Sequence, residues 1–402
     1  MGSIRGRGTY HVWNHGTFCK GIVWMVVILL SFTAMPAGAT VTEDTGPPGP
    51  AVPPAGAGGG AGTNLQFNLT YGPGITALQG SDPGLAAQVT GGFTAAGNLW
   101  SAWFNDNITI NVSVDYTGLP AGTINSASNN TEQANFANIK PALIGDATTA
   151  NDNTAIANLQ PGNSLDFIMN DTGIPAAPRI RDNNGSANNW ALDVPRGNLK
   201  ALGIRAANDP AEDGAITLSS GSSWDFDSSD GIDAGKFDFV GVAAHEIGHI
   251  MGFVSGVNIV DLVGGAGPFA PVNLNNFRVF SVLDLYRYSD DSLTADGQPA
   301  NGAVLDLAYG DTPFFSIDAG ATNLGTFSTG SYNGDGRECS HWKHNVGLGI
   351  LDPTAALGET LVISDLDLQA LDVIGYDLIP EPATMSLLGL GALALVRRRR
   401  RA

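Results

Sequence analysis

The feature that most constrains this chain is the segment from Phe237 to Ser255, an apolar stretch around a central His-Glu-x-x-His. A helix here places His245 and His249 one turn apart on the same face, where two imidazoles can bind one zinc ion. Glu246 then lies beside the ion, as a carboxylate able to take the proton of an attacking water. The flanking Val, Ala and Ile residues predict a buried helix, and Gly252 marks its end.

The same five-residue pattern also occurs in ordinary helices, so the positions of the other histidines matter. The chain has six histidines, of which His11 and His15 lie in the N-terminal leader described below. The rest fall in two short stretches, as expected if a metal ion selected them. These four are His245, His249, His341 and His344.

A catalytic zinc site needs a third protein ligand, and several residues compete for the role. Ser255 stands six residues after the second histidine, where many zinc peptidases have another histidine, and serine is a poor ligand. Asp261 is one alternative, and His341 and His344 are two others. The histidines are a better choice of ligand than Asp261, although on this stretch alone surface positions that flank a buried Trp342 are the favoured interpretation for both. The residues alone leave the third ligand open.

The pattern His-Glu-x-x-His-x-x-Gly-Phe, followed 92 positions later by Ser-His-Trp-Lys, resembles the leishmanolysin-like branch of the metzincin zinc metallopeptidases. In that branch the third histidine follows a long insertion and precedes a Trp. The resemblance implies a zinc ion held by His245, His249 and His341, with Glu246 as the catalytic base. It also implies an endopeptidase, with proteins or peptides as substrates.

The metzincin clan has a Met-containing turn beneath the metal, and Gly349–Pro353 occupies that place here. Leu351 stands where Met is expected, and its similar volume preserves an apolar floor. Tyr332 and Tyr376 are candidates to assist the oxyanion, although packing in the core is the favoured expectation for both. Cys339 is expected to be a small buried residue rather than a fourth ligand.

Strand and helix patterns alternate before the active-site segment, which predicts a mixed sheet with helices packed on it. We therefore expect one α+β domain over residues 64–378, with a twisted mixed sheet, the active-site helix and a loop-rich C-terminal subdomain, as the resemblance implies. Hydrophobic periodicity predicts strands over 66–71, 108–114, 165–169 and 216–218, and helices over 95–104 and 363–376.

Three aspartates precede the active-site helix in a sequence typical of a cation-binding loop. Asp225, Asp227 and Asp230 are followed by Gly231, with a spacing that departs from the EF-hand loop by one residue. Calcium is the ion that such a loop would bind. The alternative is a solvated turn in which the aspartates accept hydrogen bonds from the backbone.

The N-terminal residues predict export. Residues 1–39 combine a basic start, an apolar run over 22–35 and the small residues Ala37-Gly38-Ala39, as in a signal peptide that signal peptidase removes. The alternative is a retained membrane anchor, but the run is shorter than the roughly 20 residues that a span requires. Residues 40–63 are rich in Pro and Gly and predict a flexible linker.

Residues 379–402 predict a sorting signal. They contain Pro-Glu-Pro, an apolar stretch over 383–396 and five arginines over 397–401. All three parts resemble the PEP-CTERM signal of Gram-negative bacteria, which implies transient membrane anchoring and processing by an exosortase-type enzyme. A plain C-terminal anchor is the alternative, and it would also leave the domain outside the cell.

The charge distribution excludes nucleic acid as a partner. The net charge is −19, and eight of the 19 basic residues lie in the leader and the tail, so the body is strongly acidic. Such a body suits the cell surface, the medium or a biofilm matrix. The sequence therefore predicts a secreted or cell-surface zinc endopeptidase. The alternative is a non-catalytic surface or matrix protein on a degenerate peptidase scaffold, which Ser255 and Leu351 favour.

Overall fold

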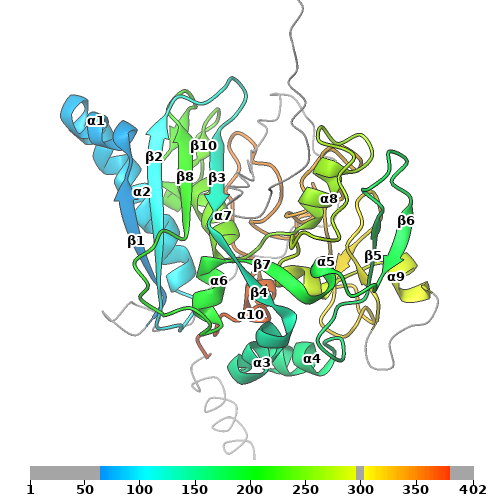
Figure 1. The fold of residues 1–402 in the computed structure, drawn as a ribbon. Helices are drawn as coiled ribbons and strands as arrows, with labels where there is room; N and C mark the ends of the chain where they lie inside the picture. The colour runs from blue at the N-terminus through cyan, green and yellow to red at the C-terminus, as the bar shows by residue number, and fades with distance from the viewer. Residues whose placement is uncertain (1–63, 296–302, 381–402) are drawn as a thin grey trace, which may run out of the picture.

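The computed structural model describes residues 64–295 and 303–380 (Figure 1). The predicted signal peptide (1–39), the linker (40–63) and all but the first two residues of the C-terminal segment (379–402) lie outside the described residues. No helix of the described part combines the length and the apolar character needed to cross a membrane. The described residues form an α+β structure with several small sheets, which confirms the predicted fold class at that level.

The largest sheet has the strand order β1-β2-β8-β3. Strands β1, β2 and β8 are parallel, and β3 runs antiparallel to β8 at one edge, so the sheet is mixed as predicted. Alternate residues of β2 are buried, which confirms the half-buried strand that its periodicity indicates. The four strands are β1 (Gln66–Tyr71), β2 (Thr109–Thr117), β3 (Asn125–Asn129) and β8 (Gly214–Ser219).

Two helices, α2 (Pro83–Ser101) and α7 (Phe239–Met251), pack against each other and against strands of this sheet (Figure 1). A Cβ atom at Gly92 would lie 2.4 Å from the ring of Phe239, so the glycine permits this close approach. The helix predicted over 95–104 corresponds to the second half of α2, which begins much earlier, after the cap at Asp82, and ends at Ser101.

The rest of the described chain has short elements joined by loops. Before α7 lie α1 (Pro73–Ser81), β4 (Thr131–Asn135), α3 (Phe136–Asp146), α4 (Ala150–Ala157), β5 (Phe167–Asn170), β6 (Arg179–Asp182), α5 (Ala187–Trp190), β7 (Ala191–Pro195), α6 (Arg196–Ala201), β9 (Trp224–Asp225), η1 (Ser228–Asp230) and β10 (Phe237–Asp238). After it lie α8 (Val257–Val263), η2 (Leu283–Tyr286), β11 (Arg287–Tyr288), α9 (Asp290–Thr294), β12 (Leu305–Asp306), β13 (Phe314–Phe315), β14 (Gly325–Thr326) and α10 (Asp365–Asp372).

The part of the chain after α7 is loop-rich, as expected, but it does not form a unit of its own. Strand β12 pairs in parallel with β5, so residues from before α7 share a sheet with residues that follow it. The core of this part is aromatic. The ring of Trp342 lies 4.8 Å from that of Phe253 and 5.0 Å from that of Phe327, centroid to centroid. The residue next to His341 is thereby fixed in the core.

Several carboxyl groups on α3, α4, α10 and nearby loops lie close enough to affect one another's charge. Burial, followed by the charge of Asp377, raises the pKa of Asp106 to about 8. Burial and the same neighbour raise the pKa of Asp146 to about 7. Burial and the charge of Asp152 raise the pKa of Asp372 to about 8. The folded protein therefore favours the protonated form of these groups.

This carboxyl cluster predicts that stability falls as the pH rises from 6.5 to 8.5. A carboxyl group with a raised folded pKa contributes its full stabilisation below its unfolded pKa and loses it as the pH passes the folded pKa. We expect Asp372→Asn to raise the unfolding free energy at pH 8 by about 1 kcal/mol or more. The reason is that an amide does not ionise, so the cost of a buried charge at residue 372 is absent. Its carbonyl still accepts the 2.8 Å hydrogen bond from Thr149.

The measurement is urea unfolding of the wild type and Asp372→Asn at several pH values. The difference between the two proteins should grow from pH 6.5 to 8.5, a window above the ordinary pKa of histidine. Parallel stability curves would show that the carboxyl group of residue 372 does not titrate in this range.

Candidate metal centre

Helix α7 lies within the predicted segment and ends at Gly252, as the sequence predicts. The carboxylate of Asp238 caps its first turn by accepting a 2.8 Å hydrogen bond from the backbone N–H of Gly241. Gly252 ends it at a φ of 132°, a conformation that favours glycine. Every residue of α7 is buried, which confirms the expected buried helix.

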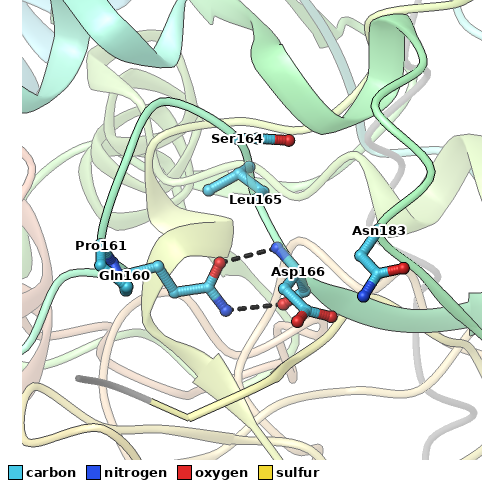
Figure 2. A pocket seen from close by; sticks show the side chains of 6 residues that line it. All are labelled: Gln160, Pro161, Ser164, Leu165, Asp166 and Asn183. Carbon is cyan, nitrogen blue, oxygen red and sulfur yellow. Dashed lines mark hydrogen bonds between the residues drawn. The ribbon is translucent and has the colours of Figure 1, made fainter. Parts of the chain in front are cut away.

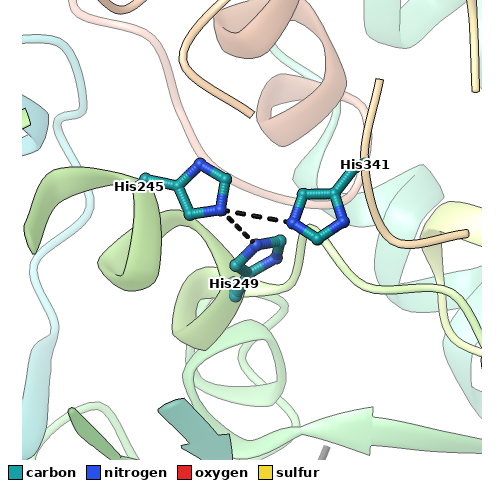
Figure 3. A group of neighbouring side chains, drawn as sticks. All are labelled: His245, His249 and His341. Carbon is teal, nitrogen blue, oxygen red and sulfur yellow. Dashed lines mark hydrogen bonds between the residues drawn. The ribbon is translucent and has the colours of Figure 1, made fainter. Parts of the chain in front are cut away.

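Three histidine side chains meet at one point (Figure 3). His245 and His249 project from the same face of α7, and His341 approaches from a loop beside it. Nε2 of His245 lies 2.9 Å from Nε2 of His249 and 3.3 Å from Nε2 of His341. One nitrogen from each ring lies within 4.8 Å of the other two. The fold thus brings His341 next to His249, although the two residues are 92 positions apart in the chain.

The opposite nitrogen of each ring, Nδ1, faces a backbone carbonyl. A carbonyl oxygen only accepts hydrogen bonds, so each Nδ1 carries the proton and each Nε2 of a neutral ring presents its lone pair. Burial lowers the pKa of His245 and His341 well below the usual value and that of His249 to about 4, which keeps all three rings neutral. The carbonyls belong to Ile350 (2.6 Å from His245), Phe253 (2.6 Å from His249) and Glu338 (3.3 Å from His341).

This donor set fits a zinc ion. Three neutral imidazoles that turn their lone pairs toward one another repel, and a cation between them removes the repulsion. Zinc binds histidine nitrogens at about 2.0–2.1 Å with tetrahedral angles, which places the nitrogens about 3.3 Å apart. The two Nε2 distances from His245 are close to that value.

The other candidates for a third ligand have different partners. Ser255 donates a 2.5 Å hydrogen bond through its hydroxyl to Asp284. Asp261 accepts hydrogen bonds from the backbone of a loop at 332–333, and His344 contacts the hydroxyl of Thr354 at 3.0 Å. The structure therefore brings only His341 to the pair on α7.

Glu246 is buried next to the three rings. Its Oε1 lies 3.9 Å from Nε2 of His245 and accepts a hydrogen bond from the side-chain amide of Asn125. Its Oε2 is buried and has no hydrogen-bond partner within the described residues. Burial, and then the charge of Glu338, raises the pKa of Glu246 well above its usual value. A cation at the histidines would favour the carboxylate again.

Asn125 is a site residue that the sequence does not reveal. It lies on β3, the antiparallel edge strand, and is fully buried against Glu246. Its segment is rich in Asn and Ser, so nothing in the pattern distinguishes this amide from its neighbours. Only the packing of α7 against β3 brings the amide and the carboxylate together.

Leu351, the residue at the Met position of the resemblance, lies against α7 at Gly248. A Cβ atom at Gly248 would lie 3.2 Å from the side chain of Leu351 and 3.2 Å from the ring of Trp100. Gly248 therefore lets both apolar side chains approach α7 between the two histidines. The preceding residue, Ile350, accepts the hydrogen bond of His245, so this turn both supports and orients the site.

The other residues singled out by the sequence have mixed outcomes. Tyr376 packs in the core, as expected, and donates a 2.7 Å hydrogen bond to the carbonyl of Met251. The expectation that Tyr332 is in the core is wrong, because this side chain is 51% exposed on a loop. Cys339 is fully buried with a free thiol, as expected for a small core residue. Burial keeps its pKa above the usual value.

The aspartate loop before α7 behaves as a hydrogen-bonded turn. Asp225 accepts hydrogen bonds from the backbone N–H groups of Asp227 and Asp233, and Asp227 accepts one from Ser229. The ammonium of Lys236 lies 4.0 Å from Asp225. Within the described residues, Asp225, Asp227 and Asp230 do not converge as the three histidines do. Calcium at this loop stays a prediction.

A hollow of about 220 Å³ lies elsewhere on the molecule (Figure 2). Gln160 and Asp166 exchange hydrogen bonds across it, and the carboxylate of Asp166 also pairs with Arg181. The side chains of Gln160 and Asp166 are thus already engaged, and no lining residue belongs to the candidate metal centre. The lining residues are Gln160, Pro161, Ser164, Leu165, Asp166 and Asn183.

Comparison with known proteins identifies the C-terminal segment. Residues 378–401 match the PEP-CTERM protein-sorting motif, which confirms the sorting signal predicted from the tail. The chain is therefore an exported, surface-associated protein of a Gram-negative bacterium that an exosortase-type enzyme sorts. No curated protein and no solved structure matches the chain. The match does not reach the three histidines of the candidate metal centre.

Proposed function

We propose that the exported domain is a zinc-dependent endopeptidase of the metzincin type, acting on proteins or peptides at the cell surface or in the surrounding matrix. One observation carries the proposal. Three neutral imidazoles turn their Nε2 atoms toward one point, and a buried glutamate with one unengaged oxygen lies beside them. His245, His249 and His341 would hold the ion, and Glu246 would act as the base.

The roles of the residues follow from their positions. Zinc, when bound, supplies a Lewis acid that polarises the scissile carbonyl and lowers the pKa of water. Glu246 takes the proton of the attacking water through Oε2 and passes it to the leaving amine. Asn125 holds Oε1, so the carboxylate keeps a fixed orientation during both transfers. The carbonyls behind the three rings keep each Nε2 turned toward the ion.

A second candidate function is a non-catalytic surface or matrix protein that retains a structural zinc site. The observation in its favour is burial: His245, Glu246 and His249 have no exposed surface, and His341 is 4% exposed. A closed site suits a structural ion, whereas an enzyme needs the covering segments to move aside. The intact glutamate favours the enzyme, because a purely structural site has no need for a buried carboxylate with a free oxygen.

The test is removal and return of the metal. We expect the purified full chain to contain one zinc per molecule, and casein cleavage to stop when a chelator removes the ion. Returning zinc should restore cleavage, while adding calcium or magnesium alone should not. Zinc content comes from mass spectrometry and cleavage from a gel or a fluorescent casein.

The outcomes separate the candidates. A protein that binds zinc and cleaves neither casein nor a peptide library would support the structural role. A protein that binds no zinc would contradict both functions.

A further inference from the structure

A single carboxylate joins the segments that surround the metal centre. Asp367 is the third residue of α10 and is fully buried. It accepts hydrogen bonds from four N–H groups that lie on three separate segments. The donors are the indole of Trp342 (2.8 Å), and the backbone of Ile350 (2.8 Å), Leu351 (3.4 Å) and Ser364 (2.8 Å).

Two of these segments act directly on the histidines. Trp342 follows His341, so the hydrogen bond that its indole N–H donates to Asp367 fixes the segment of the third ligand. The Ile350 peptide donates its N–H to Asp367, while its carbonyl accepts the Nδ1 proton of His245. A ligand on α7 and a ligand nearly a hundred residues later are therefore oriented through the same side chain.

The backbone at Gly349 approaches the carboxylate of Asp367 so closely that the residue type at this position matters. A Cβ atom at Gly349 would lie 2.1 Å from Oδ2 of Asp367, so only glycine fits at this position. The φ of Gly349 is 154°, which other residues rarely adopt. Gly349 thus allows the following residue, Ile350, to place its N–H within hydrogen-bond distance of Asp367.

Helix capping alone does not account for these contacts. Helix α4 begins with the same capping box, formed by Thr149 and Asp152. The carboxylate of Asp152 accepts hydrogen bonds from the adjacent backbone at Thr148 and Thr149 and so holds only its own turn. Asp367 caps α10 in the same way and in addition holds two distant segments.

We propose that Asp367 is a positioning residue of the metal centre, which sets the geometry of His341 and His245 and thereby the affinity for zinc; this role rests on the zinc site proposed above. An asparagine in its place has the same size, but one of the two carboxylate oxygens becomes an NH₂ group. That group points at N–H donors and cannot accept their hydrogen bonds. Those donors lose their acceptor, and the two ligand segments lose their common anchor.

The experiment compares Asp367→Asn with Asp152→Asn, the matched change in the other capping box. Zinc affinity is measured by competition with a chelator, and the visible spectrum of the cobalt-loaded protein reports ligand geometry. We expect Asp367→Asn to bind zinc about tenfold more weakly or worse and to shift the cobalt bands. Asp152→Asn should keep wild-type affinity and spectrum, whatever it does to stability.

Unchanged affinity and spectrum in Asp367→Asn would overturn the proposal. If that variant does not fold, Trp342→Phe removes one donor and keeps the ring in the core. It should show a smaller loss of affinity, and wild-type behaviour there would also overturn the role. A wild type that binds no zinc would remove the proposed site itself, an outcome distinct from wild-type binding that the Asp367 variants leave intact.

Discussion

Glu246→Gln is expected to lower peptide hydrolysis by about 10²- to 10⁴-fold while leaving the zinc content unchanged. The amide has the shape of the carboxylate but cannot accept a proton from water. Glu246 is not among the three converging nitrogen donors, so its loss should not release the ion. Because burial already disfavours its charge, the neutral amide should not destabilise the fold.

The control for this experiment is a glutamate far from the site. Glu132 on β4 is partly exposed and pairs with Arg196 and Arg205, so Glu132→Gln should retain wild-type turnover. The measurements are kcat and KM on one fluorogenic peptide, together with zinc content and thermal unfolding. Equal turnover by Glu246→Gln and the wild type would end the assignment of Glu246 as the base, even if zinc remains bound.

The sequence predicts the parts of this protein that rest on local periodicity. Helix α7 and strand β2 are long and strongly patterned, and both lie where the pattern indicates. His245 and His249 follow from helical spacing alone. His341 follows from a resemblance, and its Nε2 lies 3.3 Å from that of His245. Strands of two residues, such as β12, carry no periodicity, and their partners are distant in the chain.

The contacts that orient Glu246 and His245 cannot be predicted from local sequence, because they join segments that are distant in the chain. Asn125 and Glu246 are 121 residues apart, and the Ile350 carbonyl is 105 residues from the His245 ring that it orients. Periodicity indicates the helix over 363–376, but nothing in the sequence analysis distinguishes Asp367 within it. Only the fold shows that Asp367 caps this helix and that donors from distant segments reach the same carboxylate.

His341→Ala is expected to abolish proteolysis and to weaken zinc binding by more than the roughly 10- to 100-fold that loss of an outer partner costs. Two imidazoles on one helix leave the ion half-coordinated, since a catalytic zinc takes three protein ligands. The protection that zinc gives against unfolding should also disappear, because it follows from binding to the folded state alone. Zinc competition and thermal unfolding with and without zinc measure both effects.

His344→Ala is the matched control, because it removes a histidine three residues away. His344 is half-buried and contacts Thr354 and, at 3.6 Å, Asp352, so its imidazole is turned to a different part of the loop. This variant should bind zinc and cleave peptide as the wild type does. If His344→Ala loses zinc and His341→Ala keeps it, the converging rings of the structure do not form the binding site. Loss in both would instead indicate that the loop as a whole, rather than one nitrogen, holds the ion.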